Sequence, residues 1–247
     1  MAAWNQGKVV GQKQWNENLY SLYVEAEIEP YQSGQFARIG LEINGEIVGR
    51  PYSLVNPPTD RPLEFYYIEV AGGPLTSKLS QLKPGDTILV APRANGFMII
   101  DEVPQARDLW LIATGTGVGP FLSILATEKP WQRFERVILV YAVRTLSELS
   151  YQERIQQVQA KYSQQFSYVP ILSREAADFA LPGRIPQRFL DGSLEASAGV
   201  AVDVEHSQIM LCGNPQMVED TTALLIERGL KRHKRKDPGQ ITVESYW

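Results

Sequence analysis

Cysteine and histidine are scarce in this sequence. Its 247 residues include one cysteine, Cys212, and two histidines, His206 and His233. A disulfide needs two cysteines, an iron–sulfur cluster about four thiolates, and a structural zinc site four Cys or His ligands. None of these can be built within the chain. Any electron transfer here therefore requires an organic cofactor, and an iron–sulfur centre would belong to a partner protein.

Long apolar runs and an excess of positive charge are also missing. No stretch reaches the roughly 18 apolar residues of a membrane-spanning helix, and the first residues lack the apolar run of a signal peptide, so we expect a cytoplasmic protein. The formal net charge of −4 argues against a general nucleic-acid-binding protein, because such proteins are usually basic. With 44% hydrophobic and 21% charged residues, the composition predicts a packed globular protein.

The first hundred residues have the pattern of short strands separated by turns. Segments 19–28, 36–43, 63–70 and 87–92 are predicted strands. Asn44-Gly45 is a strong hairpin signal, and 83–86 reads Lys-Pro-Gly-Asp, a turn sequence. Many short strands with regular turns favour an antiparallel β-barrel, with one short helix within 75–82.

After about residue 105 the pattern changes to alternating strands and helices. Segments 109–113, 137–143, 166–172 and 206–212 are predicted strands, and 120–126, 153–162 and 217–229 are predicted helices. This alternation indicates a doubly wound parallel sheet. We therefore expect two domains, an antiparallel β-barrel in residues 1–102 and an α/β domain in residues 103–247.

A glycine-rich turn follows the first predicted strand of the second half. Its sequence, Ala113-Thr-Gly-Thr-Gly-Val-Gly-Pro120, places a strand end directly before a helix. Backbone N–H groups at a helix start favour anions, and glycines let a dinucleotide approach closely. The spacing is neither G-x-G-x-x-G nor that of a P-loop. On the glycines alone, a tight turn that binds nothing is an open alternative.

Arginines follow the next strands, where an NAD site usually has an acidic residue for the ribose hydroxyls. Arg144 follows the second strand, Arg174 the third, and Arg184 comes shortly afterwards. Because the ends of neighbouring parallel strands lie side by side, Arg144 and Arg174 are expected to converge. Guanidinium groups bind phosphate well, so the set favours the 2′-phosphate of NADP. Any single one of these arginines is more typical of an ordinary surface than of a phosphate site.

Five short motifs carry a resemblance that covers the chain essentially end to end. They are Arg50-Pro-Tyr-Ser53 (read as a strand start), Gly73-Pro-Leu-Thr76, Gly115-Thr-Gly-Val-Gly-Pro120, Cys212-Gly-Asn-Pro-Gln-Met217 and Val243-Glu-Ser-Tyr-Trp247. In this order they resemble the ferredoxin–NADP reductase superfamily, in particular the bacterial flavodoxin/ferredoxin–NADP reductases. The resemblance implies an oxidoreductase that binds FAD and NADP(H) and exchanges electrons with ferredoxin or flavodoxin.

Two other functions stay open at this point. One is a related FAD reductase that acts on free flavin, an oxygenase component or a ferric chelate. The other is a non-enzymatic subunit on the same scaffold, although such subunits commonly need an iron–sulfur cluster, which one cysteine cannot provide.

The resemblance also implies roles for individual residues. Arg50 would neutralise the FAD pyrophosphate, Tyr52 would lie against the isoalloxazine, and Ser53 would sit near flavin N5. Cys212 and Glu244 would border the nicotinamide pocket, with Glu244 supporting proton movement. Cys212 is otherwise a small core residue. Further expected FAD contacts are Pro51, Tyr67, Leu75, Thr76 and Thr116, and the expected NADP contacts are Thr116, Val143, Arg144, Ser173, Arg174, Arg184, Gly213, Asn214 and Gln216.

The last two residues and a basic segment near them complete the expectations. By the same resemblance, Tyr246 would cover the flavin face that nicotinamide must occupy, and would be catalytic together with Ser53, Cys212 and Glu244. Trp247 would pack on the adenine of FAD. Both aromatics could instead simply dock in an apolar groove. A docking surface for an acidic carrier would be formed by Lys231, Arg232, Lys234, Arg235 and Lys236. The alternative for these residues is a solvated helix end or loop. The protein is expected to be a monomer.

Overall fold

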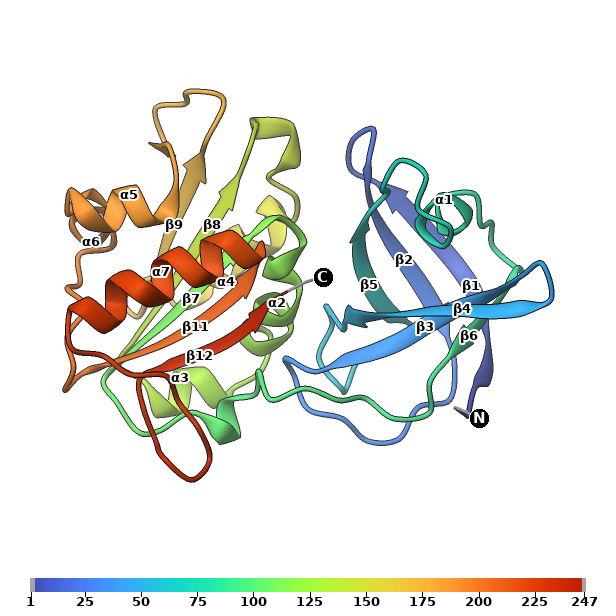
Figure 1. Cartoon of the computed structure of the whole chain (residues 1–247), viewed down its shortest axis with the longest axis horizontal. Coiled ribbons are helices and arrows are strands. Elements are labelled where there is room, and N and C mark those ends of the chain that lie inside the picture. The colour runs from blue at the N-terminus through green and yellow to red at the C-terminus, as the bar shows by residue number, and fades with distance from the viewer. Residues whose placement is uncertain (1–2, 246–247) are drawn as a thin grey trace. The chain divides into compact units, whose positions relative to one another are not determined.

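The computed structural model describes residues 3–245, so the predictions for Tyr246 and Trp247 lie outside the described residues. The chain forms two compact units (Figure 1). The first contains Met1–Ile99 and Gly119–Ala126, and the second contains Ile100–Val118 and Thr127–Trp247. The sequence pattern did not anticipate the assignment of Gly119–Ala126 to the first unit. No helix within the described residues is long and apolar enough to cross a membrane.

The first unit is built on a six-stranded antiparallel sheet with the order β4-β3-β6-β1-β2-β5. A bridge between Leu54 and Phe65 joins the end of β4 to β5, so the two edge strands meet and the sheet closes. This confirms the expected antiparallel barrel. Its strands are β1 (Asn5–Gln14), β2 (Leu19–Glu25), β3 (Phe36–Ile43), β4 (Glu46–Ser53), β5 (Leu63–Ile68) and β6 (Thr87–Val90).

Asn44 and Gly45 form the predicted hairpin between β3 and β4. Both have positive φ, 53° and 81°, as a type I′ turn requires. Pairing begins at once with Ile43 opposite Glu46 and continues to Phe36 opposite Ser53. Placing the Arg50–Ser53 motif at a strand start was therefore wrong. Because β4 begins directly after the tight turn, the motif occupies the end of that strand.

The barrel interior is filled by alternating aliphatic and aromatic side chains from its strands, among them the fully buried Leu22, Ile39 and Phe65. Two short helices belong to this unit, α1 (Thr76–Leu79) and α2 (Gly119–Leu125). The hydroxyl of Ser123 in α2 donates to the backbone carbonyl of Asn56, at 2.9 Å. The predicted helix within 75–82 is confirmed, at four residues.

The second unit is built on a six-stranded parallel sheet with the order β10-β9-β8-β7-β11-β12. The chain winds outwards from β7 to β10 and then returns to place β11 on the other side of β7. Ligands of such sheets bind at the carboxyl ends of the strands where the winding reverses, here between β7 and β11. The expected doubly wound sheet is confirmed. Its strands are β7 (Asp108–Thr114), β8 (Arg136–Val143), β9 (Phe166–Leu172), β10 (Leu181–Pro182), β11 (Ser207–Gly213) and β12 (Ile241–Ser245).

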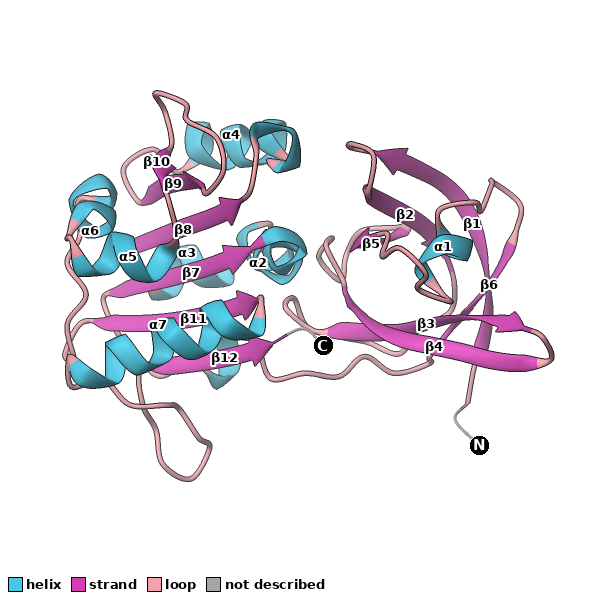
Figure 2. Cartoon of the chain, turned by 45° about the horizontal axis from the view of Figure 1, so that its top comes forward, coloured by secondary structure: helices cyan, strands magenta, loops and turns pink. Residues whose placement is uncertain are grey.

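Helices cover both faces of this sheet (Figure 2). One face carries α5 (Ile185–Leu190), α6 (Ser193–Ala198) and α7 (Pro215–Glu227), and the other α3 (Lys129–Arg133) and α4 (Gln152–Lys161). Alternate strand residues such as Trp110 and Ile138 pack with Phe189, Leu194 and Leu225. Short 3₁₀ turns lie at η1 (Ile100–Glu102), η2 (Gly115–Val118) and η3 (Leu146–Glu148).

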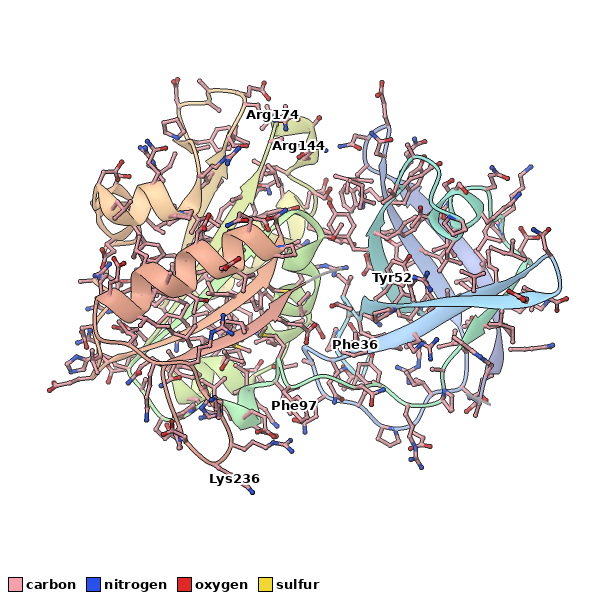
Figure 3. All side chains as sticks on the ribbon, in the orientation of Figure 1. Phe36, Tyr52, Phe97, Arg144, Arg174 and Lys236 are labelled. Atoms are coloured by element: carbon pink, nitrogen blue, oxygen red, sulfur yellow. The ribbon has the colours of Figure 1, made fainter. Side chains whose placement is uncertain are left out.

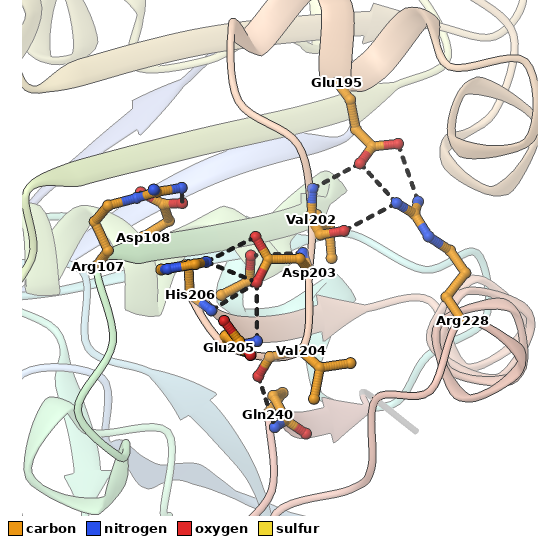
Figure 4. A network of polar contacts seen from close by, with 11 residues as sticks. Arg107, Asp108, Glu195, Val202, Asp203, Val204, Glu205, His206, Arg228 and Gln240 are labelled. Carbon is orange, nitrogen blue, oxygen red and sulfur yellow. Dashed lines mark hydrogen bonds and ion pairs between the residues drawn. The ribbon is translucent and has the colours of Figure 1, made fainter.

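A polar network ties the loop before β11 to the helices of the second unit (Figure 4). Arg228 donates to both carboxylate oxygens of Glu195, at 3.0 and 2.8 Å, and to the carbonyl of Val202 at 3.0 Å. Nearer the strand, Nδ1 of His206 lies 3.0 Å from Oδ1 of Asp203. The side chains of Arg228 and Glu195 are only 33% and 15% exposed, so this pair is poorly screened by water.

Replacing Arg228 tests the energetic weight of this network. Arg228→Ala should lower the free energy of unfolding by about 2 kcal/mol, because the Val202 carbonyl then loses its side-chain donor and Glu195 keeps only the Val202 N–H in a mostly buried place. Lys129→Ala is the control, since its ion pair with Asp101 has side chains 53% and 47% exposed and should contribute less than about 1 kcal/mol. Urea denaturation measures both, and equal losses would contradict this account.

Candidate functional site

The turns after β7 and β11 fit tightly against each other at the switch point. A Cβ added to Gly117 would lie 2.5 Å from the carbonyl oxygen of Cys212 and 2.8 Å from Cα of Gly213. Gly213 itself has φ +131° and would overlap Oγ1 of Thr114 if it carried a Cβ. That hydroxyl oxygen accepts the backbone N–H of Asn214 at 2.8 Å. Glycine is therefore required at positions 117 and 213, and the predicted glycine turn is a close backbone contact between two strand ends.

The start of α7 continues from this contact. The side-chain oxygen of Asn214 accepts the backbone N–H groups of Gln216 and Met217, at 3.0 and 3.2 Å, and Pro215 occupies the first helical position. Asn214 and Gln216 are exposed, and Thr116 in η2 is partly exposed. The structure thus brings together the predicted residues of the two turns at one edge of the sheet.

Three arginines follow three neighbouring strands at that same edge. Arg144 directly follows β8, Arg174 lies just beyond β9, and Arg184 just beyond β10. The backbone N–H of Arg174 donates to the carbonyl of Arg144 at 2.8 Å, and that of Ser173 donates to the carbonyl of Val143 at 3.0 Å. The loops of Arg144 and Arg174 therefore run side by side (Figure 3).

The three arginine side chains differ in their partners. Arg144 forms an ion pair with Glu148, with Nη2 at 2.6 Å from Oε1. Within residues 3–245, the side chains of Arg174 and Arg184 are exposed and bond to no protein acceptor. Two guanidinium groups are thus available to an anionic ligand. Sequence reasoning missed Glu148, because an i,i+4 spacing indicates a contact only within a helix and residues 144–148 were not predicted to form one.

Cys212 and Glu244 lie opposite each other on neighbouring parallel strands. The register pairs Cys212 of β11 with Glu244 of β12 on one side and with Ala113 of β7 on the other, so their side chains share one face of the sheet. Cys212 is fully buried. Burial raises the pKa of Glu244 to about 7, and within the described chain this carboxyl has no hydrogen-bond partner. A carboxyl of this kind can take up or release a proton near neutral pH.

Aromatic side chains and an arginine lie together on the barrel. Tyr52 is half-buried near the end of β4 and meets Tyr67 edge to face, with ring centroids 6.2 Å apart. Tyr67 stacks on Tyr20 at 5.5 Å. Burial raises the pKa of Tyr52 to about 12, which keeps its phenol neutral. Arg50, two residues earlier on the strand, is exposed and shares the face of Tyr52, whereas Ser53 is buried and Pro51 is exposed.

The start of α1 supplies further donors. Leu75 is buried, and the hydroxyl oxygen of Thr76 accepts the backbone N–H of Val70 at 3.1 Å. Within the described part of the chain, the backbone N–H groups of Leu75 and Thr76 donate to no protein acceptor. Such donors suit phosphate oxygens. Together with Arg50 and the face of Tyr52, the barrel carries the groups that a flavin dinucleotide needs.

Alanine at Gly117 tests the close contact between the two turns. Gly117→Ala should destabilise the protein by about 3 kcal/mol, because the added methyl group meets backbone atoms that cannot move aside cheaply. Gly115→Ala is the matched control in the same turn, where φ is +53° but open space surrounds the new Cβ, and it should cost about 1–2 kcal/mol. Urea denaturation measures both. A smaller loss for the Gly117 variant would contradict the contact.

Glu244 predicts a pH dependence of stability. Its folded pKa of about 7 lies above the ordinary value of 4.5, so in this interval the folded protein holds a proton that the unfolded chain releases. The free energy of unfolding therefore falls as pH rises from about 4.5 to about 7. Glu244→Gln removes this fall. Its free energy of unfolding, relative to that of the wild type, should therefore be about 2–3 kcal/mol higher at pH 8 than at pH 5. Urea denaturation of both proteins at pH 5 and at pH 8 measures this change. The same stability difference between variant and wild type at both pH values would refute the raised pKa.

Comparison with known proteins places the chain among relatives. The family model described as "Oxidoreductase NAD-binding domain" matches residues 111–223. The chain is 45% identical to the flavodoxin/ferredoxin–NADP reductase of Escherichia coli (strain K12), with 100% of both chains covered. It is 39% identical to the flavodoxin/ferredoxin–NADP reductase of Buchnera aphidicola subsp. Baizongia pistaciae, again with 100% of both covered.

A solved structure agrees with these relatives. The crystal structure of a ferredoxin NADP⁺ reductase from Neisseria gonorrhoeae with bound FAD and NADP superposes with a TM-score of 0.93, at 32% identity and with 100% of both chains covered. Identity of this level over the whole length, together with the two sets of site residues described above, shows common descent. The chain belongs to the flavodoxin/ferredoxin–NADP reductase family.

Proposed function

We propose that this protein is an FAD-dependent oxidoreductase that transfers electrons between NADP(H) and a one-electron carrier, ferredoxin or flavodoxin. The observation that carries the proposal is the row of arginines at the ends of β8, β9 and β10, beside the glycine contact of β7 and β11. This arrangement fits a dinucleotide with an additional phosphate. Family membership supports the same function, because the relatives named above are flavodoxin/ferredoxin–NADP reductases.

Residues 1–102 are proposed to hold FAD. When bound, FAD supplies the conversion between a two-electron hydride transfer and one-electron transfers. Arg50 offers positive charge, and the N–H groups of Leu75 and Thr76 offer hydrogen bonds to a pyrophosphate. The phenol ring of Tyr52 offers an aromatic surface. Tyr67 is only 1% exposed, so its proposed contribution is to support the Tyr52 ring edge to face. Ser53 is the proposed hydroxyl near the reacting edge, with Pro51, Thr116, Tyr246 and Trp247 as further proposed contacts.

Residues 103–247 are proposed to hold NADP(H). Arg174 and Arg184 carry no carboxylate partner within residues 3–245, and Arg144 lies beside Arg174. These guanidinium groups bind the 2′-phosphate that distinguishes NADPH from NADH. The remaining proposed contacts, Thr116, Val143, Ser173, Gly213, Asn214 and Gln216, line the strand ends. Val143 is buried and so contributes through its backbone.

Proton handling is proposed for Glu244, whose carboxyl changes protonation near pH 7. Cys212, directly opposite Glu244 in the sheet, and Ser53 complete the proposed catalytic set together with Tyr246. The role of Cys212 in this proposal is to shape the pocket wall, since its side chain is fully buried.

The carrier is proposed to dock on the basic loop, residues 231–236. This loop lies between α7 and β12, and five of its residues are exposed cations. Lys231 pairs with Asp237 and Arg235 pairs with Glu102, each at 2.6 Å. Within the described residues, the others have no ion-pair partner; they are Arg232, Lys234 and Lys236, the last labelled in Figure 3. Such charges attract an acidic carrier. A monomeric state and a cytoplasmic location stay predictions.

Neutralising two of these cations tests the docking surface. Lys234→Gln/Lys236→Gln should raise the KM for the carrier several-fold and flatten its salt dependence, because fewer charges then steer the encounter. The NADPH-dependent reduction of ferricyanide, a small acceptor, should not change. Lys78→Gln/Lys83→Gln, at two exposed barrel lysines, is the charge-matched control. Unchanged carrier kinetics in the loop variant would rule the loop out.

A comparison of acceptors tests the function itself. The purified holoenzyme should release FAD on denaturation and should reduce ferredoxin or flavodoxin with a kcat/KM far above that for free FMN or a ferric chelate. A higher kcat/KM for the free flavin or the chelate would favour the alternative reductase. A protein that binds no flavin would overturn the proposal.

A further inference from the structure

The carboxylate of Glu148 bonds to both the backbone and the guanidinium group of Arg144. Oε2 accepts the backbone N–H of Arg144 at 3.0 Å. Oε1 accepts Nε–H at 2.7 Å and lies 2.6 Å from Nη2. One carboxylate thus fixes both the start of the loop after β8 and the direction of the side chain that leaves it.

Glu148 is itself held in place by the strand below it. The hydroxyl of Tyr141, a fully buried residue of β8, donates to the backbone carbonyl of Glu148 at 3.2 Å. The N–H of Glu148 donates to the carbonyl of Thr145 at 3.0 Å. The Glu148 side chain is 15% exposed, against 48% for Arg144. A fixed, mostly buried carboxylate therefore anchors an arginine that reaches outwards.

A second carboxylate joins this turn to the neighbouring arginine loop. Oε2 of Glu175 accepts the backbone N–H of Leu146 at 2.7 Å. Glu175 directly follows Arg174, whose N–H already donates to the carbonyl of Arg144. The loops after β8 and β9 are therefore cross-linked by backbone and side-chain bonds, which fixes the spacing of the two arginines.

The bonds to Glu148 leave one edge of the Arg144 guanidinium group open. A guanidinium group has five N–H bonds, and Glu148 takes the edge formed by Nε and one side of Nη2. The opposite edge, formed by Nη1 and Nη2, makes no hydrogen bond or ion pair within residues 3–245 and can bind a phosphate with two parallel hydrogen bonds. Because the side chain is already ordered, less rotamer freedom is lost on binding.

We propose that Glu148 is a positioning residue for the coenzyme: by fixing Arg144 at the end of β8, it sets the preference for a 2′-phosphorylated nucleotide over its unphosphorylated counterpart. This inference rests on the proposed function. It assigns to an acidic residue a favourable role in binding an anion.

Repulsion between Glu148 and the phosphate opposes this role. The three arginines share these loops with three acidic residues, Glu148, Glu175 and Asp178, so the loops carry no net charge. Arg174 and Arg184 have no carboxylate partner within residues 3–245 and still present positive charge to an anion. Glu148 also lies behind Arg144, on the edge away from the open N–H groups, and the exposed surface around the site is screened by water and salt. Ordering of Arg144 therefore outweighs the repulsion.

Calorimetric titration with 2′-phospho-AMP and with 5′-AMP separates the two effects. Glu148→Ala should raise the Kd of 2′-phospho-AMP about tenfold and leave that of 5′-AMP unchanged. Glu148→Gln keeps the size of the side chain but turns one acceptor into a donor, and it should raise the Kd of 2′-phospho-AMP several-fold. Glu153→Gln removes an exposed carboxylate from the nearby start of α4 and should change neither Kd.

A double variant and steady-state kinetics complete the test. In an Arg144→Ala background, Glu148→Ala should have no further effect, because Glu148 acts through Arg144. The NADPH-over-NADH ratio of kcat/KM should fall by the same factor as the affinity, through the KM for NADPH. Unchanged or tighter binding of 2′-phospho-AMP in both Glu148 variants would overturn the role of Glu148 and leave the proposed NADP site standing. A wild-type protein that binds both nucleotides equally would overturn the NADP site and this role with it.

Discussion

The close backbone contact between the turns after β7 and β11 is the constraint on which the nucleotide site depends. Gly117 lies against the Cys212 carbonyl and Gly213 against Thr114, at distances that no other residue allows. This contact sits where the winding of the parallel sheet reverses. The contact holds the turns after β7 and β11 together, so η2 and the start of α7 lie next to each other at this edge.

The chemistry of the site follows from which groups stand at those strand ends. On one side of the switch point, arginines follow β8, β9 and β10. Glu148 holds the side chain of Arg144, and Glu175 ties the loop after β9 to the loop after β8. On the other, β12 brings Glu244 beside Cys212, and burial without a charge partner raises the pKa of Glu244 to about 7. One sheet edge thus carries arginines suited to phosphate on one side and, on the other, a buried carboxyl with a pKa of about 7.

Much of this arrangement could be predicted from the sequence, for physical reasons. The apolar runs that became β7 and β8, and the Asn44-Gly45 turn, are strong local signals because strand burial and positive φ permit few residue types. The position of the Arg50–Ser53 motif within its strand was predicted wrongly, because four residues alone do not show whether strand pairing begins or ends at them. The two-residue β10 and the six-residue α5 and α6 are too short for a period to be visible. Glu148 was missed because its role depends on a turn, η3, that only tertiary bonds define.

Single-turnover reduction of the purified holoenzyme tests the central claim most directly. The flavin absorbance would be followed after rapid mixing with NADPH and, separately, with NADH, in the absence of any carrier. If the arginine edge selects a 2′-phosphate and the bound nucleotide reduces the flavin, bleaching should be fast and complete with NADPH and far slower with NADH. Equal rates, or a faster reaction with NADH, would contradict the account of this sheet edge.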